Sequence, residues 1–228
     1  MKINIEPIAT LHSPFSGKFG IPRQPMLAPS VKSWIEFLPP YNVNAAVRGL
    51  ETVSHIWIIW QFSEFANKKW NATVRPPRFG GNKRVGVFAT RSPLRPNNLA
   101  LSAVKIDKID LDDTKRGPII EISGADIMDG SPIFDIKPYI PFTDCIAQAS
   151  ATFYTKPKTL AQVKFLDNTT QTIDNQTIKS ITEILLQDPR PAYKNDAMEI
   201  FAFEFGDFHI EFSVENNVAI VSKLEKYR

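Results

Sequence analysis

The sequence predicts a mainly β protein in two parts, a β-barrel or β-sandwich followed by a smaller α+β domain. Eighteen of the 228 residues are proline, which the interior of a helix tolerates poorly, and fifteen of these prolines precede residue 142. Short apolar runs separated by turn residues fill this first part. The second part combines one amphipathic helical pattern with runs in which apolar and polar residues alternate, as they do in strands.

Four runs in the first part are predicted strands. The run 53–62 is rich in branched and aromatic residues, which is typical of a well-buried strand. Further strands are predicted at 84–90, 103–109 and 118–128. Gly124 lies inside the last run and marks a bulge or a close approach of another segment. No glycine-rich turn joins a strand to a helix here, so the sequence lacks the dinucleotide-binding fingerprint of the Rossmann folds.

The composition changes near residues 142–156, which predicts one domain over 1–148 and a second over 149–228. In the second domain, residues 176–187 have apolar side chains at helical spacing. Asp174 precedes this run and is a suitable N-cap, and Pro189 lies just beyond its end.

A three-stranded meander is predicted to follow the helix. Its strands are 199–205, 208–214 and 218–224, joined by turns at Gly206-Asp207 and Asn216-Asn217. In the first strand, alternation places Phe201, Phe203 and Phe205 on one face. Together with the helix, this meander forms a small α+β unit.

The cysteines, the histidines and the apolar runs restrict both the expected cellular location and the kinds of site that the chain can contain. Cys145 is the single cysteine, so no internal disulfide can form and a reducing, cytoplasmic location is expected. The N-terminus lacks the pattern of a secretory signal, and no apolar run approaches the 18 residues of a membrane-spanning helix. Three scattered histidines and one cysteine give no metal-ligand spacing, so no metal site is expected.

Positive charge is concentrated in one window. Residues 65–106 contain nine lysines and arginines and no acidic residue, although the formal net charge of the chain is only +3. Phosphates, nucleic acid or an anionic cofactor are the natural partners of such a field. Five of the nine are arginines, whose guanidinium groups match phosphate and carboxylate geometry. The alternative is a basic loop that only solvates the fold.

Four segments combine proline with charged side chains. They are 22–25, 75–97, 126–141 and 188–193. Proline fixes φ and holds neighbouring loop residues in place, and rigid loops on a β scaffold commonly carry functional side chains. A single segment of this kind is often only a well-made turn, whereas four in one chain favour a functional site. Spacing alone does not identify the reaction.

These segments also carry a family resemblance. GVFATRSPLRPN, DGSPIFDIKPYIP, the early PRQP and the late DPRPAY resemble the TsaA/TrmO family over most of the chain. The resemblance implies an S-adenosylmethionine-dependent tRNA methyltransferase that acts on N6 of N6-threonylcarbamoyladenosine at position 37, next to the anticodon. It also implies a single-sheeted β-barrel with a small C-terminal domain, and a homodimer. One departure is Asn98-Leu99-Ala100, where the family commonly has Pro-Ile-Gly.

The resemblance implies a cofactor site for S-adenosyl-L-methionine. Arg23 or Arg91 would bind its carboxylate, Asp129 would accept from a ribose hydroxyl or the amino group, and Gly130 would permit close backbone approach. A salt bridge that locks a turn is the alternative role of Arg91 and Asp129. The implied cofactor-binding residues are Pro22, Arg23, Gln24, Arg91, Leu101, Ile127, Met128, Asp129 and Gly130.

The tRNA anticodon stem-loop is the implied partner of the basic window. Phosphates would contact Lys68, Lys69, Arg75, Arg78, Lys83, Arg84 and Arg95. Trp70 and Phe79 lie among them and are either base-stacking or core residues. The catalytic candidates are Asp188, Arg190 and Tyr193, and Tyr139 and Asp135 are further candidates for a general base.

Two other functions remain open from the sequence. One is a non-catalytic RNA-binding β-barrel module that uses the same basic window. The other is a different enzyme on a small anionic substrate, with phosphate bound by Arg75, Arg78 and Arg91.

Overall fold

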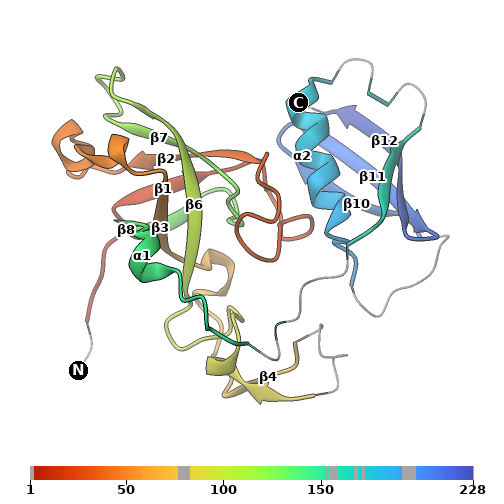
Figure 1. Cartoon of the computed structure of the whole chain (residues 1–228), viewed down its shortest axis with the longest axis horizontal. Coiled ribbons are helices and arrows are strands. Elements are labelled where there is room, and N and C mark those ends of the chain that lie inside the picture. The colour runs from red at the N-terminus through yellow and green to blue at the C-terminus, as the bar shows by residue number, and fades with distance from the viewer. Residues whose placement is uncertain are drawn as a thin grey trace. The chain divides into compact units, whose positions relative to one another are not determined.

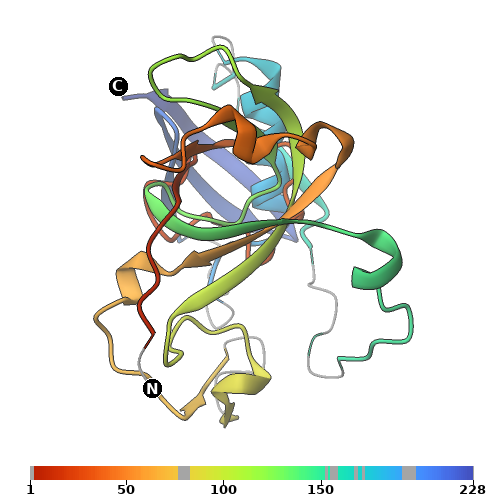
Figure 2. The same cartoon turned by 90° about the vertical axis from the view of Figure 1, so that its left-hand side faces the viewer.

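The computed structural model describes residues 3–76, 83–151, 154, 159–166, 169–170, 173–191 and 199–227. Six strands close into a barrel in the order β1-β2-β7-β6-β3-β8 (Figures 1 and 2). Their bounds are Ala9–His12 (β1), Lys32–Phe37 (β2), His55–Gln61 (β3), Leu99–Asp110 (β6), Ile119–Ser123 (β7) and Ser131–Pro138 (β8). The predicted β-barrel is therefore confirmed over the alternative of a sandwich.

The barrel interior is filled by the alternate side chains of its strands. In β3, Ile56, Ile58 and Trp60 are buried while their neighbours are half-buried. The buried Trp60 indole donates through Nε1 to the Ser102 hydroxyl at 3.0 Å, which satisfies two polar groups inside the barrel. A short helix, α1 (Pro141–Asp144), follows β8, and Asp144 accepts a 2.7 Å hydrogen bond from the Trp57 indole of β3.

The strand prediction at 84–90 is wrong over most of its length. Only Val85–Gly86 (β5) pairs, with Thr73–Val74 (β4), and Val87–Ala89 forms a 3-10 turn (η5). The carbonyls of Val87 and Thr90 accept from the Arg95 guanidinium rather than from a neighbouring strand. The other predicted strands are present as β3, β6 and β7, and β7 ends at Ser123 rather than at 128.

Short 3-10 turns also occur at Asn44–Val47 (η1), Leu50–Thr52 (η2) and Ser63–Phe65 (η3).

Gly124 lies directly after β7, where its amide donates to the carbonyl of Val31 and its own carbonyl accepts from the Met26 amide at 2.8 Å. The prediction of a close approach at Gly124 is thereby confirmed.

The C-terminal part contains a four-stranded sheet in the order β10-β11-β12-β9, with one helix. The elements are Gln162–Phe165 (β9), α2 (Asn175–Leu186), Phe201–Phe205 (β10), Phe208–Glu215 (β11) and Val218–Lys226 (β12). Asp174 caps the helix as predicted, with its side chain accepting from the Thr177 amide at 2.9 Å. The meander is also confirmed, but β9 adds a fourth strand, parallel to β12.

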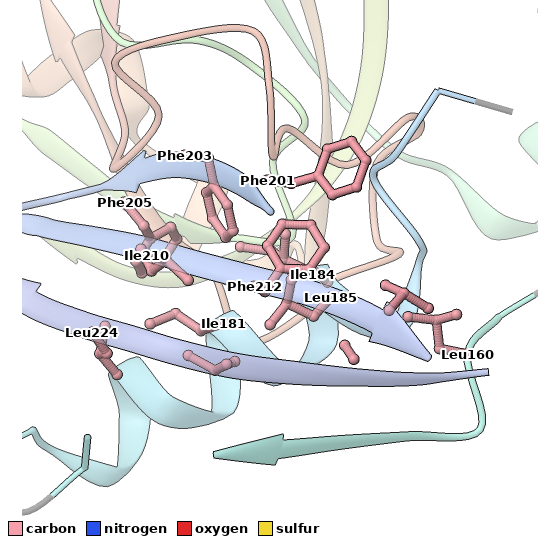
Figure 3. Packing of buried hydrophobic residues seen from close by; sticks show 14 of the residues in the cluster. Leu160, Ile181, Ile184, Leu185, Phe201, Phe203, Phe205, Ile210, Phe212 and Leu224 are labelled. Atoms are coloured by element: carbon pink, nitrogen blue, oxygen red, sulfur yellow. The ribbon is translucent and has the colours of Figure 1, made fainter. Parts of the chain in front are cut away.

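The apolar face of this sheet packs against α2. Phe201, Phe203 and Phe205 are buried, as the alternation predicts, and Figure 3 shows them with Ile184 and Leu185 of the helix in one cluster. Burying such side chains contributes roughly 1.5–3 kcal/mol each, so this cluster is the main source of stability for the C-terminal sheet and helix.

The described chain divides into two compact units that are interleaved in sequence. One comprises Met1–Leu11, Trp34–Ile122 and Gly130–Thr155, and the other comprises His12–Ser33, Ser123–Asp129 and Lys156–Arg228. Phe15, Ala28 and Val31 belong to the same buried cluster as α2 and the C-terminal sheet. The segment His12–Ser33, from the first half of the sequence, therefore contributes to the core of the second unit.

Two features are absent from the described residues, a membrane-spanning helix and a metal-binding cluster. Within those ranges, no helix combines the length and apolarity that crossing a membrane requires. The same part of the chain contains no group of three or more His, Cys, Asp or Glu side chains arranged to bind a metal ion.

Candidate functional site

The predicted cofactor loop and the predicted catalytic segment meet within the second unit. The Arg23 guanidinium donates through Nη2 to the carbonyls of Asp188 and Arg190, at 3.2 and 3.1 Å. Pro22 is buried and Arg23 is exposed. A guanidinium has five N–H groups, so these two bonds leave Arg23 with donors for a ligand.

Asp188 and Arg190 form a two-pronged ion pair beside Arg23. Arg190 donates from Nε to Oδ1 of Asp188 at 2.8 Å and from Nη2 to Oδ2 at 3.0 Å. The Arg190 side chain is 10% exposed and that of Asp188 is 29% exposed. Asp188 has a left-handed backbone with φ of 47°, which is uncommon for a residue other than glycine. Arg190 therefore fixes both oxygens of a carboxylate that solvent can still reach.

The predicted cofactor segment around Asp129 is tied to the residues after β1. The Asp129 carboxylate accepts from the Ser13 amide at 3.0 Å and lies 3.7 Å from Nδ1 of His12. The Ser13 hydroxyl donates to the carbonyl of Ile127 at 2.8 Å. Half of the Asp129 side chain is exposed, so the carboxylate retains acceptor capacity.

Helix α2 also anchors the segment that follows the early PRQP motif. Glu183 accepts from both the amide and the hydroxyl of Ser30, each at 2.7 Å, and the Ser180 hydroxyl donates to the Ser30 carbonyl at 3.0 Å. The residues of these contacts are about 150 positions apart in sequence. Neither Ser30 nor Glu183 was predicted as functional, because no local sequence pattern indicates that they pair.

Three further predicted cofactor residues belong to the first unit. Leu101 is exposed on β6, and Arg91 is exposed beyond η5. Gly130 has φ of 73°, and no heavy atom beyond the glycine and its two chain neighbours lies within 4 Å of the position that a Cβ would occupy. A ligand backbone or ribose could therefore approach Gly130 closely.

The motif that contains Arg91 is braced by hydrogen bonds. Arg95 donates through Nη1 to the carbonyls of Val87 and Thr90, and the Tyr154 hydroxyl donates to the carbonyl of Ala89 at 3.3 Å and accepts from the Arg91 amide at 3.1 Å. Asn98 is buried with φ of 51°, and its side-chain amide donates to the carbonyl of Pro93. Ala100 lies within β6 opposite Trp60, so this strand accommodates alanine where the family commonly has glycine.

The basic window is largely exposed where it is described. Lys68, Lys69, Arg75, Lys83 and Arg84 are exposed, whereas Arg95 is half-buried. Lys68 lies over the ring of Phe65 with its Nζ 4.6 Å from the centroid, and Arg84 donates to the Thr73 hydroxyl at 3.1 Å. Trp70 is 50% exposed, which favours stacking over a core role.

Three predicted residues lie outside the described part of the chain. They are Arg78, Phe79 and Tyr193. The general-base candidates Asp135 and Tyr139 lie on and next to β8. There Asp135 pairs with Lys137 at 2.9 Å, and the Tyr139 ring lies 5.4 Å from that of Trp57.

The donors and acceptors of these segments fit the polar parts of S-adenosylmethionine. That molecule has a carboxylate, which a guanidinium such as that of Arg23 or Arg91 would bind. It also has ribose hydroxyls and an ammonium group, which a half-exposed carboxylate such as that of Asp129 would accept.

Models of two protein-family domains match the chain in order. The tRNA-methyltransferase O N-terminal domain matches residues 10–145, and the TrmO C-terminal domain matches residues 158–227. A protein of Escherichia coli named tRNA (adenine(37)-N6)-methyltransferase is 38% identical over 218 residues, 92% of each chain. A Pseudomonas aeruginosa protein whose provisional name places it among S-adenosylmethionine-dependent methyltransferases is 37% identical, over 85% of this chain and 84% of its own.

Solved structures agree with these matches. A crystal structure of TrmO from Pseudomonas aeruginosa has a TM-score of 0.79 at 29% identity, covering 99% of this chain and all of that one. A human protein that shares the name of the Escherichia coli relative is 39% identical over 137 residues, which is 59% of this chain and 30% of the human one.

Proposed function

Because the chain belongs to the tRNA-methyltransferase O family, we propose that it transfers a methyl group from S-adenosylmethionine to N6 of N6-threonylcarbamoyladenosine at position 37 of tRNA. The chain is an S-adenosylmethionine-dependent tRNA N6-methyltransferase. Three curated relatives are named tRNA (adenine(37)-N6)-methyltransferase, and the name of another includes S-adenosylmethionine-dependent methyltransferase. The observation that carries this is the match of both family domains, in order, over nearly the whole sequence. The modified adenosine as substrate is our proposal.

We assign cofactor binding to the two segments that the second unit holds together. S-adenosylmethionine supplies a methyl group on a sulfonium centre. Arg23 binds the carboxylate with the N–H groups that its bonds to the carbonyls of Asp188 and Arg190 leave over. Asp129 accepts from the ribose hydroxyls, and Ser13 keeps its carboxylate in position. Pro22, Gln24, Ile127 and Met128 are the further proposed cofactor residues of this unit. Arg91, Leu101 and Gly130, which belong to the first unit, remain separate predictions.

We assign Asp188 as the general base that removes the proton from N6 of the substrate. The ureido-like nitrogen is a weak nucleophile, so a positioned base that removes its proton during methyl transfer contributes roughly 10²–10⁴-fold. Asp188 has an exposed part, and Arg190 orients its carboxylate, as a base in a catalytic pair requires. Tyr193 belongs to the same motif and completes the proposed catalytic set. Alignment of the reacting atoms supplies a further share of the rate.

We propose that the basic window, residues 65–106, binds the anticodon stem-loop of the tRNA. Its proposed phosphate contacts are the exposed Lys68, Lys69, Arg75, Lys83 and Arg84, with Arg78 and the half-buried Arg95 as further proposed contacts. A cytoplasmic location completes the proposal, since tRNA is the substrate of the family and the chain has a single cysteine. The homodimer remains a prediction from the family resemblance alone.

Transfer of a radiolabelled methyl group to tRNA tests the proposal. The substrates are tRNA isolated from cells that make the threonylcarbamoyl modification and the same tRNA from cells that do not. We expect label only in the modified tRNA, at position 37. Equal labelling of both samples would show that the threonylcarbamoyl modification is not required and would contradict the proposed substrate. Binding of tRNA without any transfer would instead support the non-catalytic RNA-binding module.

A further inference from the structure

We propose that Phe88 is a fixed platform on which one unpaired base of the tRNA anticodon loop stacks. This inference rests on the proposed function, because it names the RNA contact of the same enzyme. It starts from an exposure that folding does not explain. The Phe88 side chain is 74% exposed, although its neighbour Val87 is 1% exposed. Leaving a phenylalanine in water forgoes the stabilisation that its burial would give.

The backbone that carries Phe88 is held from several sides. Thr90 donates to the carbonyl of Val87 through both its amide, at 3.0 Å, and its hydroxyl, at 2.8 Å. Arg95 donates to the carbonyls of Val87 and Thr90, and Tyr154 donates to the carbonyl of Ala89. The Val87 amide donates to the carbonyl of Ala72 at 2.9 Å. The ring is therefore presented by a rigid turn, so stacking on it costs little ordering of the protein.

The surroundings of Phe88 match a nucleic acid base and its phosphates. The Arg95 guanidinium lies 5.9 Å from the ring centroid, as in a cation–π pair. The residues from 65 to 106 include no acidic side chain. The hydrogen bond from the Val87 amide joins the turn to Ala72, which lies two residues after Trp70 and directly before β4. RNA loops are recognised through splayed bases that stack on aromatic or arginine planes, with phosphates bound by nearby cations.

The variants Phe88→Ala and Phe88→Trp test this inference. Removing one stacking platform weakens nucleic acid binding by about 5- to 140-fold. We expect Phe88→Ala to raise the Kd for the tRNA by a factor in this range and Phe88→Trp to restore it. The affinity for S-adenosylmethionine and the native mass are expected to stay at wild-type values. The slope of log Kd against log salt is also expected to stay unchanged, since stacking releases no counterions.

Phe142→Ala is the matched control. Phe142 is 88% exposed in the same unit but lies in α1, outside the basic window. We expect this variant to bind tRNA like the wild type. A direct readout uses anticodon stem-loops with 2-aminopurine at one loop position at a time. Wild type, Phe88→Trp and Phe142→Ala are expected to quench the fluorescence at the same position, and Phe88→Ala is expected not to quench it.

Other results would overturn the inference in distinguishable ways. If Phe88→Ala binds and quenches like the wild type while the wild type methylates tRNA, the platform is wrong and the proposed function stands. If Phe88→Ala instead changes the affinity for S-adenosylmethionine or the native mass, Phe88 contacts the cofactor or a second subunit. A wild type that binds no tRNA would overturn both the platform and the proposed function.

Discussion

Arginines that look alike in the sequence have different partners in the structure. Arg23 donates to the carbonyls of Asp188 and Arg190, Arg190 donates to the Asp188 carboxylate, and Arg95 donates to the carbonyls of Val87 and Thr90. A sequence assigns each of them a positive charge but not these partners, which for Arg23 lie 165 and 167 residues away. Arg95 was predicted to contact phosphate, and its hydrogen bonds to the turn give it a bracing role as well.

A single substitution at Asp188 can separate the role of the proposed base from that of the proposed cofactor contacts. We expect Asp188→Asn to lower kcat by roughly 10²–10⁴-fold, because asparagine cannot take the proton from N6. The Kd for S-adenosylmethionine is expected to stay near the wild-type value. The measurements are single-turnover methyl transfer and calorimetric titration of the cofactor. A variant that methylates at the normal rate would exclude Asp188 as the base.

Asp129→Asn is the matched carboxylate control for that experiment. It retains an oxygen that can accept from the Ser13 amide but loses the charge available to the cofactor. A hydrogen bond to a charged group contributes about 1.5–3 kcal/mol, so we expect the Kd for S-adenosylmethionine to rise by roughly 10- to 150-fold. Unchanged cofactor affinity would place the ribose or amino group elsewhere.

Whole elements were predictable where a repeating pattern is long enough. The branched and aromatic run of β3, the alternation in β10, the helical spacing in α2 and the cap at Asp174 were all visible in the sequence and are present. β1, β2 and β8 were not predicted. β1 has only four residues and β8 contains two prolines, so neither has a clear strand pattern. Their pairing is set by closure of the barrel, which no local pattern encodes.

The candidate site was also predictable only where the signal is local in the sequence. Motifs indicated the cofactor and RNA segments, because proline and charge are local properties of the sequence. The sequence did not indicate that His12–Ser33 and Ser123–Asp129 would form one compact unit with the C-terminal residues. The contacts of Glu183 with Ser30 and of Asp129 with Ser13 depend on that arrangement. Residues that hold the candidate loops in place were therefore missed, and the functional roles of the residues within the motifs remain predictions.

In the C-terminal sheet, His209 links β10 and β11 through two carboxylates. Its Nδ1 lies 2.6 Å from Glu204 and its Nε2 lies 3.2 Å from Glu211. Glu225 is its register partner on β12, and Lys223 pairs with both Glu211 and Glu225. The hydrogen bond to Glu204, aided by Glu211, raises the pKa of His209 above its ordinary value of 6.5, against the smaller effect of burial.

This raised pKa predicts how the stability of the sheet depends on pH. The contribution of protonated His209 is complete below pH 6.5, the pKa of the unfolded chain, and is lost as pH rises through the higher folded value. We expect the urea midpoint of wild type to exceed that of His209→Gln by more at pH 6 than at pH 8.5. His55→Gln is the control, because His55 bonds the Ser54 hydroxyl instead of a carboxylate. An equal difference at both pH values would contradict the prediction.

At the scale of the whole molecule, charge is divided along the chain. The window 65–106 contains nine basic and no acidic residues, whereas 107–228 contains 20 acidic and 13 basic ones. A formal net charge of +3 therefore conceals a strongly positive region. Such a region attracts a polyanion at long range, and its interaction with phosphates weakens as salt rises. The whole-chain pattern thus predicts an enzyme whose tRNA affinity depends steeply on ionic strength.

The double variant Lys83→Glu/Arg84→Glu tests this division of charge. Each lost phosphate contact lowers the slope of log Kd against log salt by about 0.7–0.9, so the slope is expected to fall and binding at low salt to weaken. The matched control is Lys164→Glu/Lys179→Glu, which changes the net charge equally at two exposed positions outside the window. Filter binding of tRNA across a salt series measures both. If the two double variants lose the same affinity, tRNA responds to the total charge of the protein and the basic window is not its binding surface.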